Sequence, residues 1–156
     1  LSMLGAEQPR FSEARKKPKV LPDAWLYMGV MIAAPSVAAI MTRFDPGIQT
    51  MPIDWVFADG GKLDGYVFLD VHRAVAAYDF RRSEVLVEHD ETRKYIAGLG
   101  MIRALRRDLD PNLHAFREAF NLTEIFVSRA LAAELLAAGL KMDFLDPATM
   151  SSLTIG

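Results

Sequence analysis

Residues 31–53, MIAAPSVAAIMTRFDPGIQTMPI, decide the fold, because they place a short helix between two apolar segments. Pro35 suits the first position of a helix, and Gly47 is typical of a residue that follows a helix end. The apolar residues between them recur at i, i+3, i+4 and i+7, and they are Val37, Ile40, Met41 and Phe44. The stretch therefore predicts a strand, a helix with one apolar face, and a second strand.

Residues 124–147, EIFVSRALAAELLAAGLKMDFLDP, have the same order of patterns. Ser128 suits the cap of a helix over residues 129–138, and Gly139 suits its end. A closing strand is expected at residues 140–145. Two explanations stay open: the two stretches are an internal duplication, or any strand–helix–strand unit has this pattern.

The other segments predict further short strands and one more helix. Continuous or alternating apolar residues predict strands at 25–33, 48–57, 65–71, 84–89 and 125–127. Residues 95–109 predict one or two more strands, whereas residues 72–79 fit a strand or a helix equally well. Asp110 followed by Pro111 is typical of a helix start, with an apolar face made by Leu113, Phe116 and Phe120.

Together these elements predict an α+β fold, with a mixed, mainly antiparallel sheet on which two or three short helices pack. A chain of 156 residues falls in the range of one domain. Residues 1–23 are polar and rich in proline, which predicts an irregular N-terminal arm. Residues 24–147 are expected to form a single domain, and residues 148–156 a loose C-terminal tail.

The composition excludes several classes of function. The chain has no cysteine, so disulfides, thiolate metal sites and cysteine nucleophiles are absent, and a reducing cytoplasm fits. Its formal net charge of -2 provides no general attraction to nucleic acid or to anionic membranes. We therefore expect neither nucleic acid nor a membrane as a partner.

One stretch keeps a membrane-related alternative open. Residues 24–42 carry no charge and follow a basic cluster, as in an envelope-attached protein anchored by this segment. Pro22 and Asp23 separate the cluster from the apolar run, and Pro35 would break a spanning helix. These residues favour two shorter elements over an anchor.

The residues that carry chemistry lack the companions that catalysis, cofactor binding or metal binding would need. The three histidines, His72, His89 and His114, are not at the spacing of ligands on one helix. We therefore predict no catalytic residue, no cofactor and no metal site, and a protein that is not an enzyme. The enzymatic alternative is a small enzyme that uses Asp54, Asp70 or His72 on the strand pair, and it predicts a pocket that collects at least two of them with shifted pKa values.

Three runs give the chain a family resemblance: PGIQTMPIDW (46–55), GYVFLDVHRAVAAYDFRRS (65–83) and HAFREAFNLTEIFVSRALAAELLAAGLKMDF (114–144). In order and spacing they resemble the bacterial polymorphic-toxin immunity proteins of the myxobacterial type. The short matching steps are Asp79 with Ser83, Phe116 with Arg117, and Val127 with Ser128. The chain departs from the pattern over residues 118–123, where Glu118 replaces the family's apolar residue directly after Arg117.

The resemblance implies a cytoplasmic protein that binds and neutralises a cognate toxin. Our hypothesis is that it inhibits the toxin by occlusion, without catalysis. Contact residues are chosen on residue type, because aromatic and arginine side chains dominate binding energies. Asp59 and Asp64 are expected to form a charged rim against a basic toxin surface. The expected anchors are Trp55, Tyr66, Phe116 and Arg117. The toxin's identity and the oligomeric state do not follow from the sequence.

Overall fold

The computed structural model describes residues 10–89, 91–149 and 151. The fold is α+β with mostly antiparallel strands and two helices, as the sequence predicts. The strands of its first half are β1 (Arg10–Glu13), β2 (Ala24–Tyr27), β3 (Val30–Ala33), β4 (Gln49–Pro52), β5 (Asp54–Phe57) and β6 (Val67–Asp70). Those of its second half are β7 (Ala74–Val75), β8 (Val85–His89), β9 (Lys94–Leu99), β10 (Ala115–Glu118) and β11 (Ile125–Val127), and the helices are α1 (Pro35–Phe44) and α2 (Arg129–Ala137).

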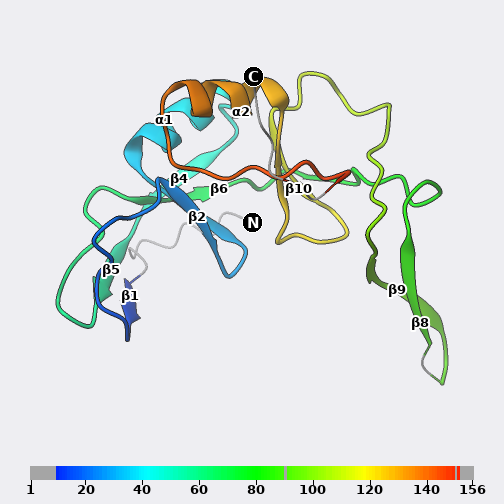
Figure 1. Ribbon diagram of the computed structural model, residues 1–156, viewed down its shortest axis with the longest axis horizontal. Coiled ribbons are helices and arrows are strands. Elements are labelled where there is room, and N and C mark those ends of the chain that lie inside the picture. Colours follow the sequence, from blue (N-terminus) through cyan, green and yellow to red (C-terminus); the bar gives the residue numbers. More distant parts are fainter. Residues whose placement is uncertain (1–9, 90, 150, 152–156) are drawn as a thin grey trace.

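The central sheet is antiparallel throughout and has the strand order β2-β3-β6-β4. Successive side chains of a strand point to opposite faces, so each face of this sheet builds a separate core. On one face Met31 and Leu69 pack with α1 and α2, whereas Ile32 and Phe68 belong to an aromatic core on the other. Figure 1 shows both helices on one side of the sheet, with β1 and β5 on the other.

The predicted single strand over residues 25–33 is wrong, because the chain turns back at Met28 and Gly29 to make the hairpin β2–β3. Both residues have positive φ, 49° and 80°, which is the backbone of the two-residue turn that fits the twist of a hairpin. The sequence pattern does not reveal this turn, because the run is apolar throughout and no polar face marks where one strand ends and the next begins.

The predicted irregular N-terminal arm contains a strand at Arg10–Glu13. These residues form β1, which pairs in parallel with β5 and places Phe11 in the aromatic core. The predicted strand at 48–57 is likewise interrupted: β4 pairs with β6, and after Ile53 the chain leaves that sheet as β5 to pair with β1. The proposed division into arm, domain and tail stays a prediction.

The helix predicted from Asp110 does not form, and the chain instead makes an Asx turn followed by β10. The Asp110 carboxylate accepts hydrogen bonds from the Asn112 backbone and side-chain amides. β10 then lies between β11 and β7, antiparallel to β11 and parallel to β7. The apolar spacing at 113, 116 and 120 suits a helix, but pairing with two distant strands decides the conformation.

The prediction for the last helix is confirmed at its ends. The Ser128 side chain accepts a hydrogen bond from the Leu131 N–H, and Gly139 has a φ of 72°, which suits a helix terminator. The strand predicted at residues 140–145 is wrong, because the segment forms no strand and only Leu145 within it makes a β-bridge. The second stretch therefore lacks the closing strand that the first one has in β4.

Candidate partner-binding surface

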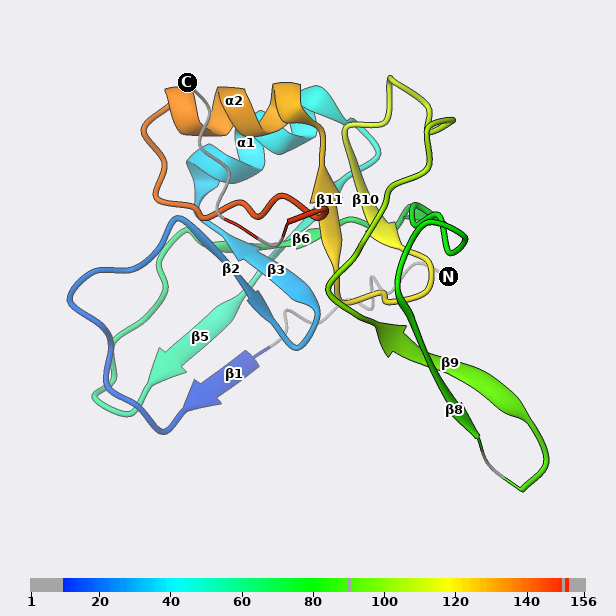
Figure 2. The ribbon, with the colours of Figure 1, turned by 45° about the vertical axis from the view of Figure 1, so that its right-hand side comes forward.

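The hairpin β8–β9 projects from the body of the molecule, as Figures 1 and 2 show. It forms a two-stranded sheet of its own. A free two-stranded hairpin is only marginally stable in water unless another element covers one of its faces. In the described structure its large apolar side chains are exposed at four positions, namely Leu86, Val87, Tyr95 and Ile96.

The two faces of this hairpin differ in chemistry. Val85 lies opposite Leu99, and Val87 lies opposite Ile96. We call these four residues the apolar hairpin face. Alternation along β8 puts Leu86 on the other face, where the Tyr95 hydroxyl donates to the Glu88 carboxylate at 3.0 Å. By the same alternation His89 and Lys94 lie next to Val87 and Ile96 at the end of this face, and the opposite face carries Leu86 beside the Tyr95–Glu88 pair.

Further apolar side chains are exposed at the base of the hairpin and in nearby turns. The rings of Phe80 and Phe120 meet edge to face with their centroids 5.5 Å apart. Exposed large apolar residues also include Met28, Met101, Ile102 and Leu122. In Figures 1 and 2 the β2–β3 turn, the β10–β11 loop and the hairpin all point away from the side that carries the helices. A contiguous exposed apolar patch is typical of a surface that binds another protein, so this side of the molecule is the candidate surface.

A groove of about 620 Å³ lies beside β11, and we call it the β11 groove. Its sides come from the segment at 103–113 and from the C-terminal segment at 143–147. On its floor the rings of Phe116 and Phe126 stack with centroids 5.3 Å apart, and Tyr78 meets Phe126 edge to face. The floor is therefore aromatic.

A polar network borders this floor. The Tyr78 hydroxyl donates to a Glu124 carboxylate oxygen at 2.8 Å, and Arg103 approaches the other oxygen at 3.2 Å. Burial, followed by the hydrogen bond to Glu124, raises the pKa of Tyr78 to about 12. The network holds β11 against the segment around Arg103.

Trp55 and Tyr66, two of the predicted anchors, are involved in the aromatic core. Trp55 is 4% exposed, stacks on Phe11, and has an indole N–H without a hydrogen-bond partner among the described residues. Tyr66 is half-buried, and its hydroxyl donates to the Pro22 carbonyl at 3.1 Å. Burial, followed by the charge of Asp23, raises the pKa of Tyr66.

Phe116 and Arg117, the other two predicted anchors, lie on β10. Phe116 is buried under the β11 groove. The half-buried Arg117 guanidinium donates from Nε to the Val71 carbonyl at 2.6 Å, and from Nη1 to those of Gly29 at 2.5 Å and Leu122 at 2.7 Å. Arg117 thus joins the end of β6, the β2–β3 turn and the β10–β11 loop.

Glu118, at which the sequence departs from the family pattern, is 1% exposed. Its carboxylate accepts hydrogen bonds from the Ala77 N–H at 2.9 Å and the Phe120 N–H at 3.1 Å. A carboxylate is needed here to satisfy two backbone donors, which an apolar residue would leave unpaired. The departure therefore has a structural role.

The two predicted rim acids are exposed on the loop between β5 and β6. Asp59 accepts hydrogen bonds from the Gly61 N–H at 3.1 Å and the Lys17 N–H at 3.2 Å. Asp64 is exposed, and no hydrogen bond or ion pair joins it to another described residue. Both carboxylates therefore lie at the surface, and they are distant in sequence from the hairpin β8–β9.

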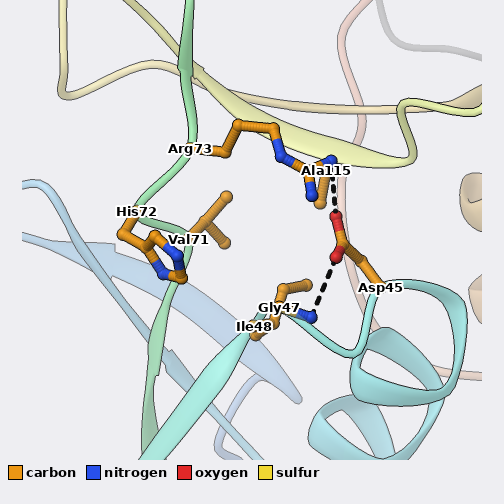
Figure 3. Close-up of a pocket in the computed structure, with 7 residues that line it drawn as sticks. All are labelled: Asp45, Gly47, Ile48, Val71, His72, Arg73 and Ala115. Atoms are coloured by element: carbon orange, nitrogen blue, oxygen red, sulfur yellow. Dashed lines mark hydrogen bonds and ion pairs between the residues drawn. The ribbon is translucent and has the colours of Figure 1, made fainter.

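The residues of the enzymatic alternative do not share a pocket. Asp54 pairs with Arg10 at 2.9 Å, and Asp70 is exposed at the end of β6. His72 borders a small cavity of about 10 Å³, which has room for about one water molecule. Figure 3 shows that cavity, where the Asp45 carboxylate pairs with Arg73 at 3.2 Å and accepts the Gly47 N–H at 3.0 Å.

Two further searches concern the described residues alone. No three histidine, aspartate or glutamate side chains in the described parts of the chain are grouped so that they could hold a metal ion. Residues 24–42, the proposed anchor, are divided between β2, β3 and α1. Within the described residues, neither helix is long and apolar enough to cross a membrane.

The sequence did not identify the two surfaces whose chemistry best suits the binding of another protein, namely the hairpin β8–β9 and the β11 groove. It predicted strands at 84–89 and 95–109, but exposed apolar side chains on both cannot be recognised until the pairing is known. The β11 groove combines segments more than 20 residues apart in the sequence, and no sequence pattern predicts it. The one available signal was the short apolar run at residues 85–87, which Glu84 precedes and Glu88 follows.

Comparison with known proteins adds one match. A family model described as "Immunity protein family (Imm11)" matches residues 5–149. A comparison with curated proteins finds no match. The matched range contains the hairpin, the β11 groove and all six predicted contact residues.

Proposed function

The chain belongs to the Imm11 immunity protein family, and we propose that it binds and neutralises a cognate bacterial toxin by non-catalytic occlusion. Membership indicates an immunity function and suggests a role without catalysis. In this proposal the protein acts in the cytoplasm, where it covers the active site of the toxin or holds the toxin in an inactive shape.

The observation that carries the proposal is the apolar hairpin face. An immunity protein needs a preformed surface that loses water when the toxin binds, and Val87 and Ile96 offer one on an element that reaches away from the body. Full burial of an exposed aliphatic side chain contributes about 1.5–3 kcal/mol, so a half-exposed one contributes roughly half of that. The toxin would also stabilise the hairpin by covering it.

The six contact residues chosen from the sequence have different places in this proposal. Asp59 and Asp64 stay proposed as a charged rim, because both are exposed. Trp55 and Tyr66 are proposed to act indirectly by shaping the aromatic core, and Phe116 by shaping the floor of the β11 groove. Arg117 is proposed to act in the same way, because its guanidinium already binds three carbonyl oxygens.

The test is co-expression with the toxin encoded by the adjacent gene, with growth and co-purification as readouts. Leu86 and Val87 make a matched pair, because they are neighbours with 48% and 50% exposure on opposite hairpin faces. We expect V87D to lose protection and to bind the toxin about tenfold or more weakly, or ~1.4 kcal/mol, whereas L86D still protects. Both variants should unfold at the same urea concentration as the wild type.

Two results would contradict the proposal at different points. A wild-type protein that neither binds the toxin nor restores growth would disprove the function. A V87D protein that protects as well as the wild type would leave the function standing and remove the hairpin as the contact element.

A further inference from the structure

We propose that the β11 groove binds an extended segment of the toxin, rich in basic and apolar residues, which adds to the free edge of β11 as a further strand. The inference rests on the proposed function, because it names the part of the partner that this second surface takes. Strand addition uses main-chain hydrogen bonds for affinity and pockets for alternate side chains for specificity. The β11 groove provides both features beside the unpaired outer edge of β11.

The free edge follows from the hydrogen bonds of β11. The Ser128 N–H donates to the His114 carbonyl at 2.8 Å, and the Glu118 N–H donates to the Glu124 carbonyl at 3.1 Å. Because such pairs alternate along an antiparallel ladder, the backbone groups of Ile125 and Val127 point away from β10. β11 is the outer strand of its sheet, and no described backbone or side chain bonds these outward groups.

The groove next to this edge suits the side chains of an added strand. Its aromatic floor is held by the Phe116–Phe126 stack, and Leu26, Leu105 and Leu145 add aliphatic area to its walls. A volume of about 620 Å³ accommodates several apolar side chains. Alternate residues of an extended segment would therefore enter the groove while its backbone pairs with β11.

The charge on the groove indicates the sign of its occupant. Asp110, Asp143 and Asp146 line it, and none of the three forms an ion pair with a described residue. Arg103 also lines the groove, but Glu124 neutralises it at 3.2 Å. Arg129 alone opposes the three carboxylates among the described residues. The excess of negative charge favours lysine and arginine on the incoming segment and speeds its encounter.

Amide hydrogen exchange gives the direct test, on the full chain alone and in complex with the toxin. The N–H groups of Ile125 and Val127 should exchange quickly in the free protein and at least about tenfold more slowly in the complex. If the complex forms and both amides exchange as fast as before, the groove proposal is wrong although the function stands. If no complex forms, the proposed function fails and this inference fails with it.

Two pairs of variants test the edge and the charge separately. V127P removes an outward N–H and should weaken toxin binding about tenfold, whereas V127T keeps that N–H and should bind as the wild type does. D143K should slow association at low salt by about threefold or more, whereas D70K makes the same charge change outside the groove and should not. Equal association rates for D143K and D70K would overturn the proposal, even if V127P fails to fold.

Discussion

Replacing Arg117 with alanine should destabilise the fold strongly, because one guanidinium joins three separate segments. It donates to the carbonyls of Val71, Gly29 and Leu122 at 2.5–2.7 Å. A hydrogen bond to a charged group contributes about 1.5–3 kcal/mol. The bond to Leu122 is exposed, so water replaces it, and the two partly buried bonds set the cost of R117A at about 3–6 kcal/mol.

Urea unfolding of R117A, followed by circular dichroism, measures this cost. Arg107 is the matched control, because it is exposed and makes no hydrogen bond or ion pair with a described residue, so R107A should change the free energy of unfolding by less than about 0.5 kcal/mol. R117K keeps the charge but presents a single ammonium, so it should recover part of the loss.

The interpretation of Arg117 as a structural residue has a clear opposite. If Arg117 were a contact residue, R117A would lose toxin binding while the stability of the fold stayed unchanged. If R117A unfolds within about 1 kcal/mol of the wild type and yet fails to bind the toxin, the reasoning from its three carbonyl partners is refuted.

Two further predictions concern buried polar groups. E118A should lower the free energy of unfolding by about 2–4 kcal/mol, because the N–H groups of Ala77 and Phe120 lose their acceptor; a urea midpoint unchanged from the wild type would contradict this. The pKa of Tyr78 is raised from 10.0 to about 12, so the fold favours the protonated phenol, and this stabilisation is complete below pH 10 and lost as the pH rises through about 12. Y78F has no phenol to ionise, so between these pH values it should lose less stability than the wild type, and equal losses in urea titrations would refute the assignment.

The sequence determined the elements that depend on neighbouring residues. The helix after Pro35, the Ser128 cap and the end at Gly139 are local, because each needs only a side chain or a φ angle within one turn of the chain. The family resemblance also needs only the order of short motifs, and the match over residues 5–149 confirms it.

The tertiary structure decided what long-range pairing controls. Phe116 and Arg117 have the residue types of interface anchors, but β10 places one under the groove and the other among three carbonyls. Residues 113–120 fit helical spacing, and only the strands on either side make them extended. A side chain is buried or exposed according to which distant segment covers it, and Val87 and Ile96 of the hairpin β8–β9 stay exposed. For this physical reason the sequence alone predicted the strands of the hairpin but not the exposure of their apolar side chains.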